Sequence, residues 1–481
     1  MIVLGINDSS HDASVTVCKD TKILFSAHAE RYNKEKNTFS IPNELFCDAL
    51  SFGKPDVVAY FEKRNKKRLR RALFGGINGE YDFLYSKETK ALYGIKEIQV
   101  SHHRSHACAG YYTSGFSNAI TVVIDAIGEF ETATIWECSG VGLKKIHSMK
   151  YPTSFGLFYS AFTKLLGLKP GTEEYILMGM AGFGDKDRFY KKVNLYFPRF
   201  NFQPKNMHLG ISENSFQILS DQDKYDIAAA VQRVYEDRLL EFMVLAKKIG
   251  KSDNLVFMGG CALNCVANTK LLPLWKNIWI MPNPGDSGSS MGAAASVIGK
   301  HVEWSGPYLG YEIKGDYQVD KAINHLVSDG IVAIASGRAE FGPRALGNRS
   351  LLADPRDATN KDAVNKIKKR EMFRPFAPVV LEEHASEWFD MDRPSPYMQF
   401  AFRCLKSSII PAVVHIDGTS RVQTVNKSQH EGLYSVLEKW FEITGVPVLL
   451  NTSLNIKNQP LLNDEHDVLI WGLNNPEVAI V

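Results

Sequence analysis

The chain has 481 residues, of which 44% are hydrophobic and 23% are charged, and its formal net charge is +3. This length predicts two domains, and the composition is typical of a soluble globular protein, which excludes a membrane protein or a disordered chain. A charge this small argues against stable nucleic-acid binding through a broadly basic surface. Seven scattered cysteines and the absence of a leader or a membrane-length apolar run favour a cytoplasmic location with no membrane partner.

The first residues predict three strands around a polar tip. Ile2–Ile6 and Ala13–Val17 are short apolar runs, and a turn at Lys19-Asp20 leads to a third run at Ile23–Ala27. Between the first two runs lies the polar sequence Asn7-Asp-Ser-Ser-His-Asp12. A single acidic residue at a strand end is common turn chemistry, so this tip alone predicts no site.

A dense basic run follows at Arg64–Arg71. Such a run is most often the solvated face of a helix. The alternative is a surface that binds an anionic substrate, such as a compound that carries a phosphate group. The sequence leaves both interpretations open.

The sequence Ser101-His-His-Arg-Ser-His-Ala107 places two histidines four residues apart. On a helix, His102 and His106 project from one face, which is the spacing that two nitrogen ligands of one divalent cation require. A pair of hydrogen-bonded core histidines would have the same spacing. If carboxylates complete the site, the ligand set favours Fe(II), with zinc or manganese as alternatives.

The strand plan of the N-terminus recurs roughly a hundred residues later, which suggests an internally duplicated α/β domain. Here the apolar runs Ile120–Ile124 and Thr132–Trp136 flank the polar tip Asp125–Glu129, and a further strand is expected near Leu143–His147. Acidic tips that face each other are how an actin-like or sugar-kinase-like cleft holds a metal and nucleotide phosphates. We therefore expect Asp8 and Gly128 on the nucleotide side of a cleft and Asp125 at a metal.

Helices and glycine-rich turns are expected next. Tyr159–Leu166 predicts a helix, and Lys224–Ile249 predicts a buried crossover helix because its apolar residues recur at helical spacing. Between them, the glycines of Gly171–Gly184 would let the backbone approach a ligand, with Glu173 or Glu174 as a carboxylate beside it, of which we favour Glu174.

Two later segments supply further candidates. A strand at Leu255–Met258 breaks at Gly259-Gly260 into a helix, whose free amides suit an anion while Asn264 can bond a ribose or base. Asp286 stands at another strand end, before a helix of small residues. The predicted metal ligands are therefore His102, His106, Asp125 and Asp286.

The composition changes near His301–Asp316, where we place the boundary between a first domain of residues 1–305 and a second of residues 306–481. A strand is expected at Ile331–Ala335. Beyond it, cations cluster in three loops, Gly337–Ser350, Lys368–Pro378 and His415–Thr424, and a fourth loop, Val446–Asn455, carries hydroxyls and amides. Surface polar residues near turns are the alternative, but arginines among Phe, Pro and Gly favour a pocket for phosphates and an adenylate.

These motifs resemble, over nearly the full chain, the O-carbamoyltransferases of the nodulation-protein and antibiotic-tailoring type. The matching runs are His102–Ala107, Val123–Glu129, Gly259–Asn268, Glu340–Ser350, Phe373–Pro378, Asp417–Gln423 and Asn451–Asn455. The resemblance implies an actin-like first domain of the universal tRNA-threonylcarbamoyl-transferase type. It also implies a second domain that is YrdC-like, of the threonylcarbamoyl-adenylate-synthase type.

The resemblance further implies an ATP-dependent carbamoyltransferase with a metal, typically iron, on the four ligands named above. His11 and Asp12 would lie beside the acceptor hydroxyl, and Lys36 would be an active-site lysine. The second domain would make carbamoyl-adenylate from carbamoyl phosphate and Mg-ATP, using Arg344, Lys368, Arg374, Arg421, Ser453 and Asn455. The carbamoyl group would then pass to a hydroxyl in the first domain, where His11 is our hypothesis for the general base.

Two other functions stay open at this point: a tRNA-modifying transferase and a nucleotide-binding scaffold with a degenerate site. The near-zero net charge disfavours the first, and the full set of candidate residues disfavours the second. The acceptor is expected to be a small hydroxyl compound, and the basic run suggests a hydroxymethylated pyrimidine nucleotide as one example. The oligomeric state is left open, with a homodimer as one expectation.

Overall fold

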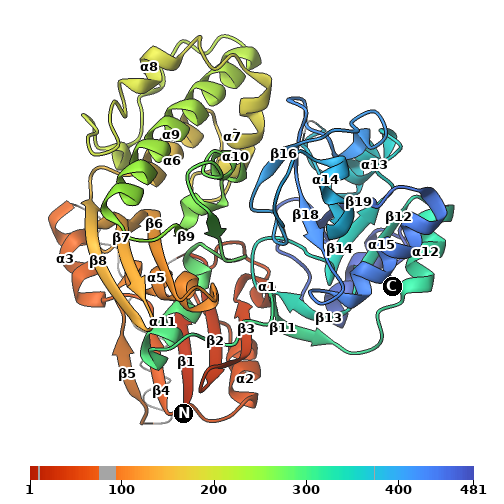
Figure 1. The fold of residues 1–481 in the computed structure, drawn as a ribbon, viewed down its shortest axis with the longest axis horizontal. Coiled ribbons are helices and arrows are strands. Elements are labelled where there is room, and N and C mark those ends of the chain that lie inside the picture. Colours follow the sequence, from red (N-terminus) through yellow and green to blue (C-terminus); the bar gives the residue numbers. More distant parts are fainter. Residues whose placement is uncertain (9–10, 75–93, 373) are drawn as a thin grey trace. The chain divides into compact units, whose positions relative to one another are not determined.

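A computed structural model describes residues 1–8, 11–74, 94–372 and 374–481, and the chain divides into two compact units (Figure 1). The first unit comprises Met1–Ala29 and Asn37–Trp304, and the second comprises Glu30–Lys36 and Ser305–Val481. The segment Glu30–Lys36, which the sequence analysis assigned to the first domain, therefore belongs to the second unit.

Two five-stranded sheets of the same topology form the centre of the first unit. Their orders are β3-β2-β1-β4-β5 and β8-β7-β6-β9-β10. In each sheet three antiparallel strands are followed by two strands that run parallel to the first one, β1 or β6. The predicted duplication is therefore confirmed. The strands are β1 (Ile2–Asn7), β2 (Ser14–Lys19), β3 (Lys22–His28), β4 (Val57–Tyr60), β5 (Lys96–Gln99), β6 (Asn118–Gly128), β7 (Glu131–Ser139), β8 (Gly142–Lys150), β9 (Asn254–Met258) and β10 (Asn277–Trp279).

Helices α5 (His102–Thr113) and α11 (Ser289–Ile298) lie between these two sheets. Helix α11 packs against β1, β2 and β4, helix α5 packs against β6, β7 and β9, and the two helices pack against each other. Their backbones approach so closely that a Cβ atom at Gly292 would stand 1.8 Å from the carbonyl oxygen of Ser105. The small residues at the start of α11 permit this contact, which brings the beginning of α5 beside the turn that precedes α11.

The other helices of the first unit surround this core. The predicted crossover helix is α9, which begins after a capping box formed by Ser220 and Asp223 and buries Ile227, Val231 and Val234. Among the described residues, no helix is both long and apolar enough to cross a membrane. The bounds are α2 (Asn43–Ser51), α3 (Arg64–Phe74), α6 (Phe155–Leu165), α7 (Glu174–Met180), α8 (Tyr190–Asn194), α9 (Asp221–Ile249) and α10 (Cys265–Thr269).

The second unit is built on a mixed sheet of order β12-β14-β19-β15-β18, in which only β15 and β18 are parallel neighbours. Two-stranded ladders β11-β13 and β16-β17 accompany it. The strands are β11 (Tyr308–Ile313), β12 (Ile331–Ala335), β13 (Gly337–Glu340), β14 (Arg349–Ala353), β15 (Ala377–Leu381), β16 (Ala401–Arg403), β17 (Thr419–Arg421), β18 (Gln423–Val425) and β19 (Val448–Ser453). The helices are α1 (Glu30–Asn33), α12 (Val319–Ser328), α13 (Thr359–Ile367), α14 (Ala385–Trp388), α15 (Glu431–Thr444) and α16 (Glu465–Asn474).

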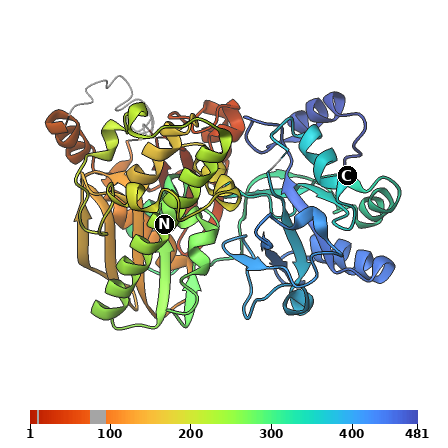
Figure 2. The ribbon, with the colours of Figure 1, turned by 90° about the horizontal axis from the view of Figure 1, so that it is seen from above.

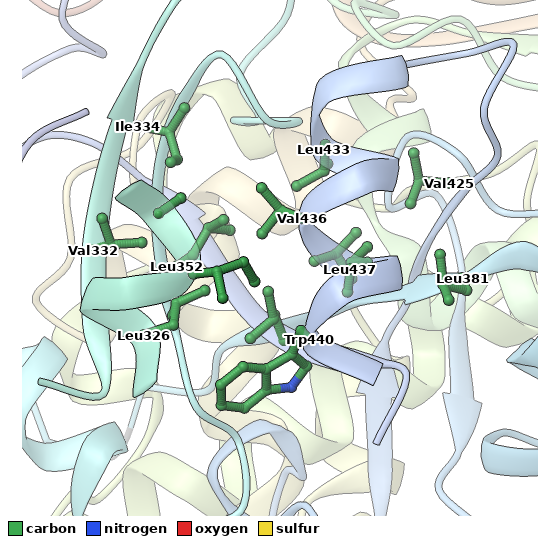
Figure 3. Close-up of a cluster of buried hydrophobic side chains, with 14 residues drawn as sticks. Leu326, Val332, Ile334, Leu352, Leu381, Val425, Leu433, Val436, Leu437 and Trp440 are labelled. Atoms are coloured by element: carbon green, nitrogen blue, oxygen red, sulfur yellow. The ribbon is translucent and has the colours of Figure 1, made fainter. Parts of the chain in front are cut away.

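Helices α12 and α15 cover this sheet and pack on each other (Figure 2). Helix α15 turns Leu433, Val436 and Trp440 toward the strands, where they join apolar residues of β12, β14 and β15 in one buried cluster (Figure 3). The Trp440 indole N–H donates to the Val448 carbonyl at 3.1 Å, so its polar atom is satisfied within the core. Both units are therefore mixed α/β structures.

His430 gives this unit a predicted sensitivity to acid. Its Nε2–H donates to Asn348 Oδ1 at 2.8 Å, and its Nδ1 accepts the Leu433 N–H at 3.0 Å as the cap of α15, so the Nδ1 lone pair requires the neutral ring. Burial lowers the pKa of His430 to about 4. The unfolded chain therefore binds the extra proton between about pH 6.5 and pH 4, and stability should fall by about 3 kcal/mol as the pH drops through that window.

The measurement is urea unfolding of the full chain at pH 7 and pH 5. In His430→Asn the side-chain oxygen keeps the cap but does not titrate. Wild type should lose more stability between the two pH values than this variant does. Equal losses would contradict the role given to His430.

Candidate metal centre and active site

Four buried side chains from three elements meet at one point in the first unit. His102 and His106 lie on the first turns of α5, Asp125 lies on β6, and Asp286 begins the 3-10 turn Asp286–Gly288 before α11. One ligand atom from each side chain lies within 4.8 Å of the ligand atoms of the other three. The structure thus brings together the four residues that the sequence predicts as metal ligands.

The distances within this cluster suit a metal ion. Nε2 of His106 lies 3.2 Å from Nε2 of His102 and 3.2 Å from Asp286 Oδ1, and Nε2 of His102 lies 3.0 Å from Asp125 Oδ2. Ligands that are about 2.1 Å from one ion stand roughly 3.0 to 3.4 Å apart. Two imidazoles and two carboxylates are also a donor set that divalent transition metals accept.

The electrostatics of the cluster also favour a metal ion. Burial alone would lower the pKa of His102 and His106, but the two carboxylates raise both above the ordinary histidine value. Burial would raise the pKa of Asp125 and Asp286, yet the histidines lower both below the ordinary aspartate value. The two carboxylates therefore favour a positive charge at the point where the four side chains meet. A divalent cation supplies it without two neighbouring imidazolium ions, which repel each other.

The tip after β1 lies beside this cluster. His11 Nε2 stands 3.7 Å from Asp286 Oδ2, and His11 Nδ1 contacts Asp12 Oδ2 at 3.0 Å. The side-chain amide of Asn7 donates to the carbonyls of Asp12 and Asp286 at 2.9 and 2.8 Å, so it fixes the tip to the turn before α11. Asp8 is buried in the same tip, and its carbonyl accepts the Tyr60 hydroxyl at 3.0 Å.

The three glycines that the sequence predicts at a nucleotide have packing roles in the structure. A Cβ atom at Gly128 would stand 2.3 Å from the His102 ring, so only glycine lets that ring occupy its place. Gly259 and Gly260 form the turn after β9, and a Cβ atom at Gly260 would stand 3.3 Å from Asp125 Oδ1. All three therefore shape the surroundings of the donor cluster.

Asn264 and Glu174 form contacts inside the first unit. The Asn264 side chain accepts the Ala267 N–H at 3.0 Å and exchanges hydrogen bonds with Gln232. Glu174 accepts from the Ser160 hydroxyl and the Gly171 N–H, both at 2.6 Å. The prediction that a helix begins directly after Gly259-Gly260 is wrong, because a 3-10 turn intervenes and Asn264 caps the short helix α10. The role of these residues in binding an anion stays a prediction.

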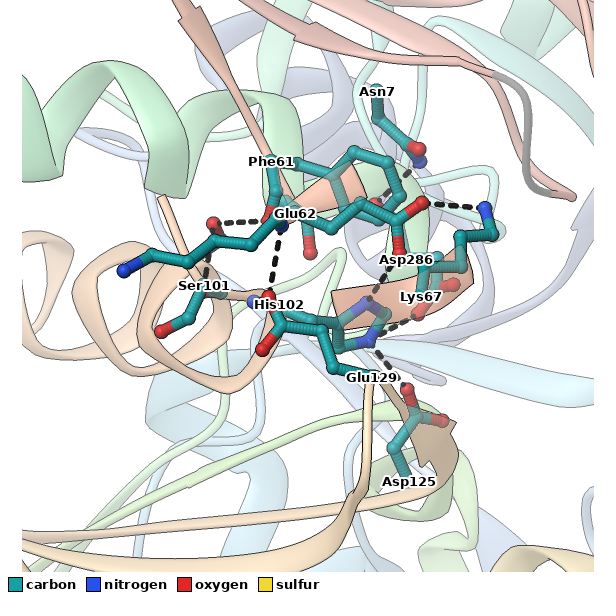
Figure 4. A network of polar contacts seen from close by, with 12 residues as sticks. Asn7, Phe61, Glu62, Lys67, Ser101, His102, Asp125, Glu129 and Asp286 are labelled. Atoms are coloured by element: carbon teal, nitrogen blue, oxygen red, sulfur yellow. Dashed lines mark hydrogen bonds and ion pairs between the residues drawn. The ribbon is translucent and has the colours of Figure 1, made fainter. Parts of the chain in front are cut away.

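The basic run 64–71 forms the first part of α3 and divides into two sets. Arg64 and Lys67 are buried and paired with Glu97 and Glu62, whereas Lys66 and Arg68 are exposed. The sequence analysis missed Glu62 and also Glu129, whose Oε1 accepts the Lys63 N–H at 2.8 Å and the His102 N–H at 3.4 Å (Figure 4). Their position just past the ends of β4 and β6, as for Asp8 after β1, is the signal that could have identified them.

A second cluster, of cations, lies within the second unit. Lys368 is 3% exposed, and its Nζ donates to Ser453 Oγ at 3.1 Å and to Asn455 Oδ1 at 2.7 Å. Burial lowers the pKa of Lys368 well below its ordinary value, and the nearby charges of Arg370, Lys36 and Arg374 lower it further. Such a concentration of positive charge suits an anionic ligand.

The segment Glu30–Lys36 enters the second unit and carries Lys36 to this cluster. Its Arg31 is 2% exposed and donates to the carbonyl oxygens of Glu340 and Gly342, the latter at 2.7 Å. Lys34 pairs with Asp467. Arg374 pairs with Glu371 at 3.0 Å, Arg344 lies on the loop after β13, and Arg421 ends β17.

Glu340 organises the loop that carries Arg344, and the sequence analysis missed this role. It is fully buried, and one oxygen, Oε1, accepts three backbone N–H groups, from Leu346 at 2.8 Å, Asn348 at 2.9 Å and Arg349 at 3.3 Å. Burial lowers the pKa of Arg349 to about 10, and the charge of Glu340 opposes that shift. The carboxylate thus both shapes the loop and balances buried guanidinium charge.

Glu340→Gln should therefore destabilise the protein by about 3 to 5 kcal/mol, because it leaves buried guanidinium groups without their counter-charge. Urea unfolding of the full chain measures this loss. Glu382→Gln is the matched control, since the partners that Glu382 has among the described residues are the neutral side chains of Thr424 and Asn426, and this change should cost about 1.5 kcal/mol or less. Equal losses in the two variants would show that the Glu340 charge is unimportant.

Comparison with known proteins shows which family the chain resembles. Residues 60–295 match the carbamoyltransferase N-terminus, and residues 323–476 match the carbamoyltransferase C-terminus. The chain is 30% identical to nodulation protein NolNO of Sinorhizobium fredii, over 96% of this chain and 77% of that one. It is 29% identical to the 3'-hydroxymethylcephem-O-carbamoyltransferase of Amycolatopsis lactamdurans, over 96% and 94% of the two chains.

Among solved structures, HypF in its phosphate- and nucleotide-bound form shares 16% identity over 62% of this chain and 46% of that chain, with a TM-score of 0.34. A likeness of that size supports no assignment of function. Fold and site define a two-unit α/β protein with a cluster of metal-type ligands in one unit and a buried group of cations in the other. The sequence matches identify the family: the chain belongs to the carbamoyltransferases and is an enzyme.

Proposed function

We propose that the protein is an ATP-dependent O-carbamoyltransferase that acts on a small hydroxyl compound. The observation that supports this most is the convergence of two imidazoles and two carboxylates at one buried point. In this proposal the first unit is an actin-like transfer domain, and the second is a YrdC-like domain that activates the carbamoyl group with ATP. The relative that is named as an O-carbamoyltransferase aligns with nearly all of this chain.

Activation is assigned to the cationic cluster of the second unit. Carbamoyl phosphate and water give carbamate and phosphate, and a carbamate oxygen then attacks the α-phosphate of ATP, so that carbamoyl-adenylate forms and pyrophosphate leaves. Both substrates are polyanions, and the transition state carries added negative charge. The charges of Lys36 and Arg374 both act on Lys368, and these three cations are proposed to neutralise that negative charge, with Arg344, Arg421, Ser453 and Asn455 as further contacts.

Transfer is assigned to the tip of β1. His11 donates through Nδ1 to Asp12, which leaves Nε2 to accept the proton of the acceptor hydroxyl. The acceptor oxygen then forms a bond to the carbamoyl carbon, and the bond from that carbon to AMP breaks. A divalent cation on the four donors, Fe(II) in our proposal, would supply a Lewis acid for the phosphate of the leaving AMP.

The state of His11 depends on its neighbour Asp286. The His11 side chain is 48% exposed, so desolvation lowers its pKa only in part, and the carboxylates of Asp286 and Asp12 raise that pKa above the ordinary value. A proton held in this way is unavailable for base catalysis. Loading of His102, His106, Asp125 and Asp286 with a cation would reduce the negative charge that His11 faces at Asp286, and would so favour the neutral, basic form of His11.

Helix α3 bears on the choice of acceptor. A hydroxymethylated pyrimidine nucleotide is one candidate, because Lys66 and Arg68 of α3 are exposed. Arg64 and Lys67 do not support it, since their charges are used in buried ion pairs. Replacing Lys66 and Arg68 by alanine should raise the KM of such a nucleotide and leave the KM of ATP unchanged; an unchanged acceptor KM would favour a neutral sugar.

The decisive experiment supplies ATP, carbamoyl phosphate and a library of hydroxyl compounds, and follows pyrophosphate release and product mass. Pyrophosphate release together with a carbamoylated product supports the proposal. Release that depends on added tRNA would indicate a tRNA-modifying enzyme, and no release would indicate a nucleotide-binding scaffold.

His11→Ala should form carbamoyl-adenylate but not transfer it. Full transfer by this variant would exclude His11 as the base.

A further inference from the structure

The two ring nitrogens of His102 face different surroundings. Nε2 lies 3.0 Å from Asp125 Oδ2 and 3.4 Å from Asp286 Oδ1, so it points into the donor cluster. Nδ1 is buried and forms no hydrogen bond within the described part of the chain. The Oε2 atom of Glu62 stands 4.0 Å from it. A buried ring N–H requires an acceptor, and a shift of about 1 Å would give Nδ1 a hydrogen bond of ordinary length.

Glu62 is held in place from its other side. It is 3% exposed, and its second oxygen pairs with Nζ of Lys67, which is 5% exposed and lies in the first turns of α3 (Figure 4). A carboxylate this deeply buried keeps its charge only beside a cation. Lys67 thus keeps the Glu62 carboxylate charged, and this carboxylate is the acceptor that faces the His102 ring. This role of the basic run differs from both predicted roles, a solvated helix face and a substrate-binding surface.

A second carboxylate fixes the backbone of the same histidine. Glu129 Oε1 accepts the N–H groups of Lys63 and His102, and its Oε2 lies 3.7 Å from Nζ of Lys66. The turn from β4 into α3 is therefore tied to the beginning of α5 at two points. Glu129 contacts the His102 main chain, and Glu62 faces the His102 ring.

We propose that Glu62, kept charged by Lys67, is a positioning residue for the metal centre. It accepts the Nδ1–H of His102, selects the tautomer with a free Nε2 lone pair and fixes the plane of the ring toward the cation. This inference rests on the proposed metal site and assigns the buried half of the basic run to it. Partners of this kind alter metal affinity by about 10- to 100-fold when removed.

The test uses Co(II), whose visible spectrum reports ligand geometry, with affinity measured by competition against a chelator. Two double variants remove the ion pair without leaving a buried charge, E62Q/K67M and E62L/K67M. The Gln amide oxygen can still accept from Nδ1–H, whereas Leu cannot. E62L/K67M should bind Co(II) about 10- to 100-fold more weakly with an altered spectrum, and E62Q/K67M should recover most of the affinity.

The matched control is R64M/E97Q, which removes the other buried ion pair of α3, one in which Arg64 lies over the Tyr60 ring. It should bind Co(II) as wild type does. Wild-type affinity and spectrum in E62L/K67M would overturn the inference. If that variant does not fold, wild-type behaviour of E62A would overturn it instead.

The failure of this inference can be told apart from failure of the metal site itself. If wild type binds no Co(II), or if His106→Ala binds it as tightly as wild type does, the metal site is wrong and the role of Glu62 is wrong with it. If His106→Ala loses Co(II) while E62L/K67M retains full affinity, only the role of Glu62 is wrong.

Discussion

Replacing His106 by alanine should abolish metal binding and carbamoyl transfer while pyrophosphate release from ATP and carbamoyl phosphate continues. His106 is fully buried, and its Nε2 contacts the carboxylates of Asp286 at 3.2 Å and Asp125 at 3.6 Å. Loss of a direct ligand should exceed the 10- to 100-fold effect typical of outer-shell changes. Metal content by elemental analysis, product mass and pyrophosphate release measure the three quantities.

His103→Asn is the matched control for this prediction. His103 lies between the two predicted ligands on the same helix, but its Nδ1 contacts Thr134 Oγ1 at 2.9 Å and it is not part of the donor cluster. Asparagine can preserve that hydrogen bond, so metal content and transfer should stay near wild type. A His106→Ala variant that retains both its metal and its transfer activity would disprove the metal centre.

Replacing Lys368 by methionine should give the reverse pattern, with metal retained and carbamoyl activation lost. The Lys368 ammonium holds Ser453 and Asn455 and is surrounded by further cations, so it is the centre of the proposed polyanion site. Removing one charge-stabilising donor of this kind typically costs about 100- to 1000-fold in rate. Pyrophosphate release measures this loss, and elemental analysis should show a wild-type metal content.

Lys457→Met is the control for Lys368→Met. Lys457 is a partly exposed lysine of the same unit that pairs with Glu371. Its removal should change pyrophosphate release little, since exposed ion pairs contribute about 1 kcal/mol or less. Pyrophosphate release at the wild-type rate by Lys368→Met would move the activation site elsewhere.

Local sequence patterns were sufficient for much of the first unit. Apolar runs separated by polar tips predict β1, β2, β6 and β7, because an alternation of buried segments and turns is encoded within a few residues. The pair His102 and His106 predicts a shared helical face for the same reason. The donor cluster was predicted by adding to this pair two acidic residues expected at strand ends, Asp125 from the repeated strand plan and Asp286 from a separate segment.

Long-range pairings could not be predicted in this way. Nothing in the sequence near Glu30–Lys36 shows that Arg31 reaches the carbonyl oxygens of Glu340 and Gly342, about three hundred residues later. The basic run was ambiguous because its sequence does not show which cations are buried: Arg64 pairs with Glu97 on strand β5, and Lys67 pairs with Glu62, which lies just before the run. The turn after Gly259 was mispredicted since a side-chain cap, rather than free amides, begins helix α10.

The seven residues Glu30–Lys36 belong to the second unit although they lie within the sequence of the first, and this limits how the chain can be cut or recombined. A fragment cut at Ser305 would lack Arg31 and Lys36, so the carbonyl oxygen of Gly342 would lose its buried guanidinium partner. Neither half is a continuous stretch of gene that recombination could transplant intact. A circular permutant or a split version would have to carry these residues along, and evolution of this architecture must have kept the two halves in one reading frame or rebuilt that contact.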